Sequence, residues 1–274
     1  MGLAMIDLHT HLLPGIDDGA DSLETALEMA RIAVQDGTTV LACTPHIYPG
    51  LYMNDAAGIG RERDKLQAAL DTFGIPLRLT IGADAHLVPE LLDGLQTGRV
   101  PTLAGSRYFL LEPAHHVAPP GFEQLVLEIL LAGYVPVITH PERLTWIEDH
   151  YPSFVNLACQ GCWLQLTAGS IVGKFGKRAR YWSERLLDEG MVHIVASDAH
   201  TTGRRSPRMS DAIPVLERHV GAEETRRLLE ARPQAILDDR PVDQVAPPPG
   251  LSGDARTRPA GRGLARLRRL LARH

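Results

Sequence analysis

Two kinds of hydrophobic pattern alternate along the chain. Short apolar, β-branched runs of strand length recur seven times, and helical patterns of apolar positions lie between them. The short runs predict strands at residues 4–9, 38–45, 77–84, 108–112, 135–140, 162–167 and 192–197. The longer patterns predict helices at residues 22–35, 54–73, 121–132, 150–160, 178–189, 209–219 and 222–231.

This alternation predicts an α/β fold built on a parallel sheet. A strand followed by a helix returns to the sheet through a right-handed crossover, which makes successive strands parallel. The predicted strands are apolar on both faces, as strands covered on both sides must be. Seven such strands in succession, without a dinucleotide-binding glycine fingerprint, favour a closed or nearly closed seven-stranded (β/α)7 barrel over residues 1–240.

Composition excludes several other classes of protein. The chain has 274 residues, 44 % of them hydrophobic and 22 % charged, as in an ordinary soluble domain. Its apolar runs are far shorter than the roughly 20 residues of a membrane span. Asp7 and His9 interrupt the N-terminal apolar stretch, so no secretory signal is predicted. Cys43, Cys159 and Cys162 provide neither a disulfide framework nor a paired zinc motif, which favours a reducing cytoplasm.

Residues 241–274 differ in composition from the rest of the chain. They contain seven arginines and two aspartates, which leaves 21 basic and 31 acidic residues in residues 1–240. This acidic body argues against nucleic acid as the partner. Prolines between 241 and 259 predict a stiff, largely unstructured linker, and leucines predict a short amphipathic helix at 261–274. Such a tail is either a solvated extension or a weak anchor for a membrane surface or a partner.

Polar residues gather at the carboxyl ends of the predicted strands. Six of the seven strands end in histidine or a carboxylate. In a parallel barrel these ends meet at one face, where barrel enzymes have their active sites. So many ionisable groups would be too costly to bury together unless they were paired or bound to metal. The sequence therefore predicts a polynuclear metal site at this face.

The spacing of these residues supports the same interpretation. His9 and His11 are two residues apart, as are Asp198 and His200, so each pair points to one face of an extended strand. The loop at residues 17–19 can fold a carboxylate over the same face, although its Asp-Gly sequence alone would indicate an ordinary turn. Imidazole and carboxylate donors without thiolate suit Mn, Fe, Zn or Co.

Several motifs together resemble a known superfamily. They are Asp7-x-His9-x-His11, Asp17-Asp18-Gly19, Thr44-Pro45-His46, His140-x-Glu142-Arg143 and Ser197-Asp198-x-His200. The combination resembles the polymerase and histidinol phosphatase (PHP) superfamily over residues 5–235. The Arg107-Tyr108 pair and the basic run at 177–181 resemble its bacterial protein-tyrosine phosphatases of capsular and exopolysaccharide biosynthesis. The resemblance implies a distorted, TIM-like barrel of PHP type with three divalent metal ions, usually manganese.

The resemblance also implies roles for individual residues. The metal ligands that it implies are His9, His11, Asp18, His46, Asp84, Glu112, His140, Asp198 and His200. Arg143 and Arg205 correspond to the arginines that contact phosphate, with the adjacent Arg204 as the alternative to Arg205. His200 or a metal-bound water would protonate the leaving group. Asp7 is expected to orient an imidazole rather than to bind a cation.

One position departs from the family pattern. Many relatives have glutamate at the end of the third strand, where this chain has Asp84, whose side chain is shorter by one bond of about 1.5 Å. We predict that Asp84 still binds and bridges two cations, because the small residues Gly82, Ala83 and Ala85 allow the backbone to approach. His86 is the substitute ligand if Asp84 falls short.

The expected reaction is hydrolysis of phosphotyrosine on a protein. The resemblance implies a tyrosine autokinase that controls capsular or exopolysaccharide synthesis as the substrate. A metal cluster lowers the pKa of a bound water towards about 7 and so supplies hydroxide as the nucleophile. No cysteine in the chain stands in a Cys-x5-Arg phosphate loop. The alternatives are a small-molecule phosphomonoesterase of histidinol-phosphatase type and a non-catalytic, metal-bearing regulatory module.

Overall fold

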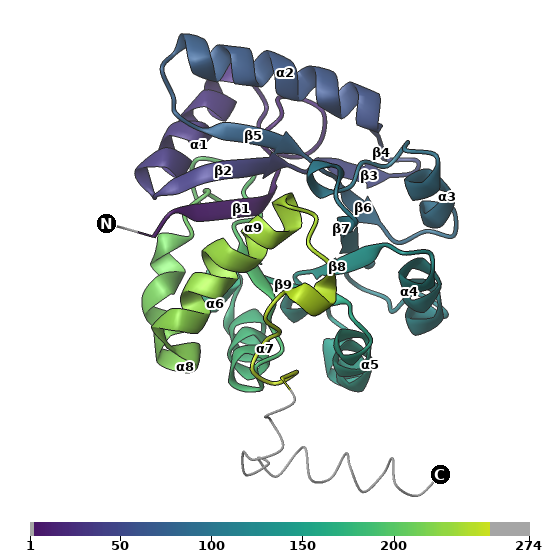
Figure 1. Cartoon of the computed structure of the whole chain (residues 1–274). Coiled ribbons are helices and arrows are strands. Elements are labelled where there is room, and N and C mark those ends of the chain that lie inside the picture. Colours follow the sequence, from purple (N-terminus) through teal and green to yellow (C-terminus); the bar gives the residue numbers. More distant parts are fainter. Residues whose placement is uncertain (1–2, 253–274) are drawn as a thin grey trace, which may run out of the picture.

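The structure is a computed structural model that describes residues 3–252 (Figure 1). Its strands are β1 (Met5–Thr10), β2 (Thr38–Cys43), β3 (His46–Tyr48), β4 (Tyr52–Met53), β5 (Arg78–Ile81), β6 (Asp84–His86), β7 (Tyr108–Glu112), β8 (Val135–Thr139), β9 (Trp163–Thr167) and β10 (Ile194–Ala196). Its α-helices are α1 (Leu23–Gln35), α2 (Ala56–Thr72), α3 (Leu91–Gln96), α4 (Phe122–Leu131), α5 (Ile147–Cys159), α6 (Ala168–Ile171), α7 (Lys177–Asp188), α8 (Ile213–Arg226) and α9 (Arg232–Leu237).

The strands form two sheets with parallel pairing. One sheet has the order β1-β2-β5, and the other has the order β10-β9-β8-β7-β6-β3-β4. Only the short β3–β4 hairpin is antiparallel among the strand pairs within residues 3–252. Figure 1 shows the long helices on the outside of these strands. The prediction of an α/β fold with parallel strands is therefore confirmed.

The second and third predicted strands are each followed by a further short strand. The prediction for residues 38–45 covers β2, and β3 begins at the next residue; the prediction for residues 77–84 covers β5 and ends at the first residue of β6. Each of these two segments of the chain contributes to both sheets. Hydrogen bonds continue across the interruption, because the Gly82 amide donates to the Cys43 carbonyl at 3.0 Å and the Asp84 amide to the Pro45 carbonyl at 3.1 Å. Beyond the interruption, β3 and β6 pair in parallel, and their first residues, His46 and Asp84, are partners in the register.

Alternate residues of each strand join different cores. Tyr108 and Leu110 of β7 pack in an inner cluster with Trp163, while Phe109 and Leu111 pack in the larger cluster against the helices. Full burial of each of these aliphatic or aromatic side chains contributes about 1.5–3 kcal/mol. Apolar residues on both faces are what the sequence pattern required of parallel strands.

The Arg107-Tyr108 pair fastens the end of α9 to the start of β7. The Tyr108 hydroxyl donates to the Arg240 carbonyl at 2.7 Å, and Arg107 Nε donates to Asp239 Oδ1 at 2.9 Å. Ile236 of α9 joins the inner cluster. The pair therefore closes the core at the amino ends of the strands, away from the strand-end histidines.

Residues 241–252 pack on the body of the protein. The Gly250 amide donates to the Gly190 carbonyl at 2.9 Å, and the buried Arg232 donates from Nε to the Ala246 carbonyl at 2.9 Å. Leu251 packs against the larger core cluster. The prediction of an unstructured linker is therefore wrong for residues 241–252, because their apolar side chains find partners. The helix predicted at 261–274 lies outside the described residues.

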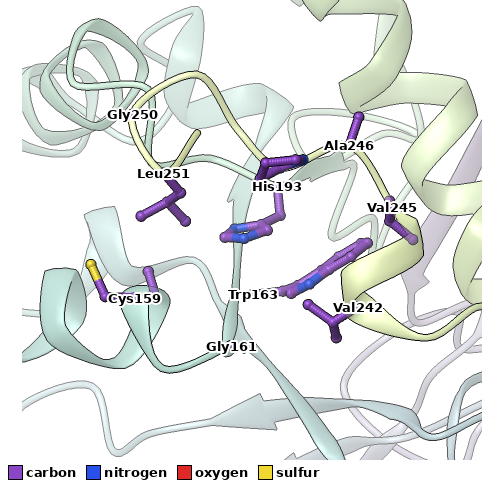
Figure 2. A pocket seen from close by; sticks show the side chains of 11 residues that line it. Cys159, Gly161, Trp163, His193, Val242, Val245, Ala246, Gly250 and Leu251 are labelled. Carbon is purple, nitrogen blue, oxygen red and sulfur yellow. The ribbon is translucent and has the colours of Figure 1, made fainter. Parts of the chain in front are cut away.

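This C-terminal segment encloses a cavity of about 330 Å³ at the amino ends of β9 and β10. The ring of His193 stacks on Trp163 at 5.1 Å between centroids, and both line the cavity with Cys159 and Leu251 (Figure 2). The candidate metal ligands lie at the opposite ends of the strands. Within residues 3–252, we find no helix with the length and apolar character that a membrane crossing requires.

Candidate metal centre

The carboxyl ends of the strands bring the nine candidate ligands together. Eight of them fall into groups whose ligand atoms lie within 4.8 Å of one another. These groups are His11, Asp18, His46 and His200; His9, His11 and Asp84; His46, Asp84 and Glu112; and Glu112, His115 and His140. The ninth, Asp198, has Oδ1 at 3.4 Å from His9 Nε2 and 3.5 Å from His11 Nε2. The predicted residues therefore form one continuous cluster.

His9 of β1 and His11, which follows β1 directly, are fully buried, and a side chain contacts Nδ1 of each. His9 Nδ1 lies 2.8 Å from Gln165 Oε1, and His11 Nδ1 lies 2.7 Å from Asp17 Oδ2. Both Nε2 atoms therefore point into the cluster, 3.3 Å apart. Gly19 lets the loop close over β1, because a Cβ at this position would lie 2.1 Å from the His11 carbonyl oxygen.

Asp84 lies inside the cluster despite its short side chain. Its Oδ2 is 3.4 Å from His9 Nε2 and 3.5 Å from His46 Nδ1, which places it between β1 and β3. Gly82, between β5 and β6, lets this part of the chain pack against the core, because a Cβ there would lie 2.8 Å from the Leu103 side chain. His86 is farther out, with Nδ1 3.7 Å from Glu112 Oε2 and its ring stacked on Tyr48.

The donor atoms of this cluster fit divalent cations. Both carboxylate oxygens of Asp84, His46 Nδ1, His140 Nδ1 and His200 Nε2 are buried without a hydrogen-bond partner in the described part of the chain. A buried polar atom left unpaired costs about 1–3 kcal/mol, and such atoms are rare in folded proteins. Cations bound between imidazole and carboxylate donors would satisfy most of these atoms, and this donor set suits Mn, Fe, Zn or Co.

The charges of the cluster are strongly coupled. Burial disfavours the imidazolium of His9, but the carboxylates of Asp84 and Asp198 outweigh burial and raise its pKa to about 9. The pKa of His46 rises to about 10, against burial, because Glu112 and Asp84 face it. The carboxylates around His9 and His46 therefore favour a positive charge at these two positions, as a bound cation would supply.

Two residues at the strand ends have left-handed backbone conformations. His140 has φ of 34° and Asp198 has φ of 51°. Such conformations cost about 1–2 kcal/mol for residues with a Cβ and concentrate at functional sites. The turn at His140 is followed by Glu142, whose fully buried carboxyl accepts from the Thr167 amide at 3.0 Å. Burial raises the pKa of Glu142 to about 7.

Two arginines converge at the rim of the cluster. Arg143 Nη1 and Arg205 Nη2 both donate to Asp198 Oδ2, the latter at 2.9 Å. The Phe175 ring lies under both guanidinium groups, 4.5 Å from Arg143 Cζ and 6.0 Å from Arg205 Cζ. Arg204 turns away and donates from Nε to the Lys174 carbonyl at 3.1 Å. Of the two adjacent arginines, Arg205 is therefore the one that faces the cluster.

Three residues beside the cluster make contacts that the sequence did not predict. Asp7 braces two strand ends, since its Oδ1 accepts from the amides of His9 at 3.3 Å and Ser197 at 3.0 Å rather than from an imidazole. Asp17 is the acceptor for His11. His115 lies beside Glu112, and its three-residue spacing from that carboxylate is the only sequence signal that could have found it.

Comparison with known proteins agrees with this geometry. A family model described as capsular polysaccharide synthesis, CpsB/CapC, matches residues 5–238. Tyrosine-protein phosphatase YwqE of Bacillus subtilis is 36 % identical over 246 residues, covering 89 % of this chain and 96 % of the relative. Tyrosine-protein phosphatase CpsB of Streptococcus pneumoniae is 27 % identical over 241 residues, covering 86 % and 99 %.

A solved structure provides the same comparison in three dimensions. It is one of the crystal structures of YwqE from B. subtilis and CpsB from S. pneumoniae, described as unique metal-dependent tyrosine phosphatases. It matches with a TM-score of 0.82 at 34 % identity, over 86 % of this chain and 96 % of the other. The family match spans most of the chain, and this chain therefore belongs to the CpsB/CapC family of capsular polysaccharide synthesis.

Proposed function

We propose that this protein is a metal-dependent protein-tyrosine phosphatase. The observation that carries the proposal is the position of Arg143 and Arg205, which converge at the rim of a cluster of metal-ligand side chains. The relatives named as tyrosine-protein phosphatases support the same activity. The relatives' names and the family's description support a phosphotyrosyl protein of capsular or exopolysaccharide synthesis as the substrate, and we propose that it is a tyrosine autokinase in the cytoplasm.

We propose that the nine side chains hold three divalent cations, with Mn as the first candidate and Fe, Zn or Co as the others. We place one cation near His9, His11 and Asp84, a second near Glu112 and His140, and a third near Asp18, His46 and His200; the groups described above support this division. When bound, such cations lower the pKa of a coordinated water and neutralise charge on phosphoryl oxygens.

The chain's own residues bind and orient the phosphoryl group. The side chains of Arg143 and Arg205 are 16 % and 28 % exposed, so an incoming phosphate can reach them. Their guanidinium groups would donate charge-assisted, bidentate hydrogen bonds to the non-bridging oxygens. Asp198 holds both arginines in place before the substrate arrives, and Phe175 limits their movement. Phosphoryl transfer depends mainly on such positioning and charge stabilisation.

We assign His200 to a cation rather than to proton transfer. Its Nδ1 lies 3.1 Å from the Asp198 carbonyl oxygen and donates a hydrogen bond to it. That bond leaves the lone pair of Nε2, buried and 3.2 Å from Asp18 Oδ1, free for a metal. A phenolate leaves with a pKa near 10, so the tyrosine product needs little help from a general acid.

We also propose that the two sheets form one distorted seven-stranded barrel. The Asp198 amide donates to the His9 carbonyl at 2.9 Å and the His11 amide to the Ala199 carbonyl at 2.9 Å, which joins the end of β1 to the segment after β10. The bonds across the interruptions of β2 and β5 join the sheets on the other side. Residues 1–240 would then carry the catalytic unit, with residues from 241 onwards as its extension.

Turnover of two substrates tests the proposed function. The full chain, reconstituted with Mn²⁺, should hydrolyse a phosphotyrosyl peptide with a kcat/KM well above that for histidinol phosphate. Chelation should abolish the activity and Mn²⁺ should restore it. A preference for histidinol phosphate would instead indicate a small-molecule phosphomonoesterase, and the absence of metal-dependent hydrolysis of either substrate would indicate a regulatory module.

A further inference from the structure

We propose that His115 is an additional metal ligand, which completes the cation site formed by Glu112 and His140. The inference rests on the metal cluster of the proposed function and extends it by one residue. His115 lies in the loop after β7, three residues beyond Glu112, and its side chain is 27 % exposed. The ligand class is a divalent cation that accepts imidazole and carboxylate donors.

The separations between the donor atoms carry the proposal. His115 Nε2 lies 3.2 Å from Glu112 Oε1, and His140 Nε2 lies 3.8 Å from the same oxygen. Two donors that each lie about 2.1 Å from one cation, at angles between octahedral and tetrahedral, are about 3.0–3.4 Å apart. The first separation falls in this range and also fits a hydrogen bond, whereas the second, at 3.8 Å, is longer than the range and too long for a hydrogen bond, so a bound cation would draw His140 closer.

The position of Asp84 explains why this site gains from a further donor. Asp84 belongs to the group with His9 and His11 and to the group with His46 and Glu112, and neither of these groups includes His140. The group of Glu112 and His140 is completed by His115 instead. A shorter carboxylate at position 84 reaches less far towards β8, and an imidazole from the loop supplies the donor from the other side.

The loop that carries His115 is held in place by its neighbours. The Thr145 amide and hydroxyl donate to the His115 carbonyl at 2.9 and 3.1 Å, and Trp146 Nε1 donates to the Ala114 carbonyl at 2.8 Å. Arg178 donates to the Thr145 carbonyl at 2.8 Å. Thr145 lies two residues beyond Arg143, so the same segment positions a phosphate-binding arginine and the added ligand.

The neighbouring His116 offers a matched control. It is exposed, its carbonyl accepts from the same Thr145 hydroxyl at 3.2 Å, and its ring centroid lies 6.3 Å from that of His115. Replacement of His116 therefore changes the same loop without removing a donor from the group of Glu112 and His140. His115→Gln provides a second comparison, because glutamine can still donate a hydrogen bond to Glu112 but is a poor ligand for these metals.

The experiment titrates the metal-free full chain and its variants with Mn²⁺ in a calorimeter and measures bound metal after gel filtration. His115→Ala and His115→Gln should each weaken binding of one cation at least 10-fold, since loss of even an outer partner of a ligand costs 10–100-fold in affinity. His116→Ala should bind Mn²⁺ with the same affinity and stoichiometry as the unsubstituted protein. Circular dichroism of each variant reports whether the fold is retained.

Three results would overturn the assignment of His115. The first is unchanged Mn²⁺ binding by His115→Ala. The second is unchanged Mn²⁺ binding by His115→Gln, which would show that the residue acts only as a hydrogen-bond partner of Glu112. The third is an equal loss of Mn²⁺ affinity in His116→Ala. Because the readout is metal binding, it is independent of the proposed reaction. If the unsubstituted protein failed to hydrolyse phosphotyrosine while His115→Ala still lost one cation, the proposed function would be refuted. The assignment of His115 as a metal ligand would remain.

Discussion

Replacement of Arg143 by alanine tests the proposed phosphate site. Arg143 and Arg205 share Asp198 Oδ2 as an acceptor and Phe175 as a support, so both guanidinium groups face one point at the rim of the cluster. A guanidinium cannot bind a metal cation, because it is always protonated and has no lone pair to offer. Arg143→Ala should therefore remove a contact to the phosphoryl group and leave the cations in place.

The size of the effect follows from the kind of contact. Loss of one donor that stabilises the charge of a transition state costs about 3 kcal/mol, which corresponds to a fall of about 100-fold in kcat. Arg205→Ala should give a loss of the same order. The assay is the steady-state hydrolysis of a phosphotyrosyl peptide, with elemental analysis of the same samples for bound metal.

Arg204→Ala is the control for both arginine variants. It removes an adjacent, equally charged side chain that donates to the Lys174 carbonyl instead of Asp198, so kcat/KM should remain within about twofold of the unchanged chain. Loss of metal from a well-folded Arg143→Ala variant would show that this arginine positions the metal ligands instead of binding phosphate. An equal loss of activity in Arg204→Ala and Arg205→Ala would refute the assignment of Arg205.

Three further results are expected. Asp84→Ala should lose at least one cation per chain by elemental analysis and nearly all turnover, whereas His86→Ala should retain its cations; full metal content in Asp84→Ala would contradict the ligand role. Asp17→Asn should weaken Mn²⁺ binding about 10–100-fold in calorimetry, since Asp17 holds His11 Nδ1; unchanged affinity would show that this contact does not matter. Iodoacetamide should modify the exposed Cys159 and leave turnover unchanged, because this thiol lines the cavity at the other end of the strands; inactivation by this label would refute a mechanism without cysteine.

The sequence predicted the main alternation of strands and helices because short apolar, β-branched runs alternate with helical patterns. It did not predict the short strand β3 or the break between β5 and β6, because the prediction for residues 38–45 ends before His46 and the prediction for residues 77–84 runs through Gly82. The interruptions depend on contacts between strands, including the bond from the Thr10 amide to Thr44 Oγ1 at 2.9 Å. The packing of residues 241–252 depends likewise on distant partners such as Gly190, which composition does not reveal.

The candidate ligands were predictable because they lie at strand ends, where a parallel fold brings distant residues together. The assignment of the phosphate contact to Arg205 rather than Arg204 stays a prediction, which the bond from Arg205 to Asp198 Oδ2 supports. The expectation that Asp7 orients an imidazole does not match the structure. Asp7 Oδ1 instead accepts hydrogen bonds from the backbone amides of His9 and Ser197. His115 was missed because it lies in a loop whose path is fixed by Thr145, 30 residues away in sequence.

The most direct test of the account follows metal content and turnover in the same sample. The metal-free full chain is titrated with Mn²⁺, and bound metal and hydrolysis of a phosphotyrosyl peptide are measured at each step. The account predicts no turnover without metal, a rise as cations bind, and a plateau when three cations are bound per chain. Full turnover by the metal-free chain would contradict it.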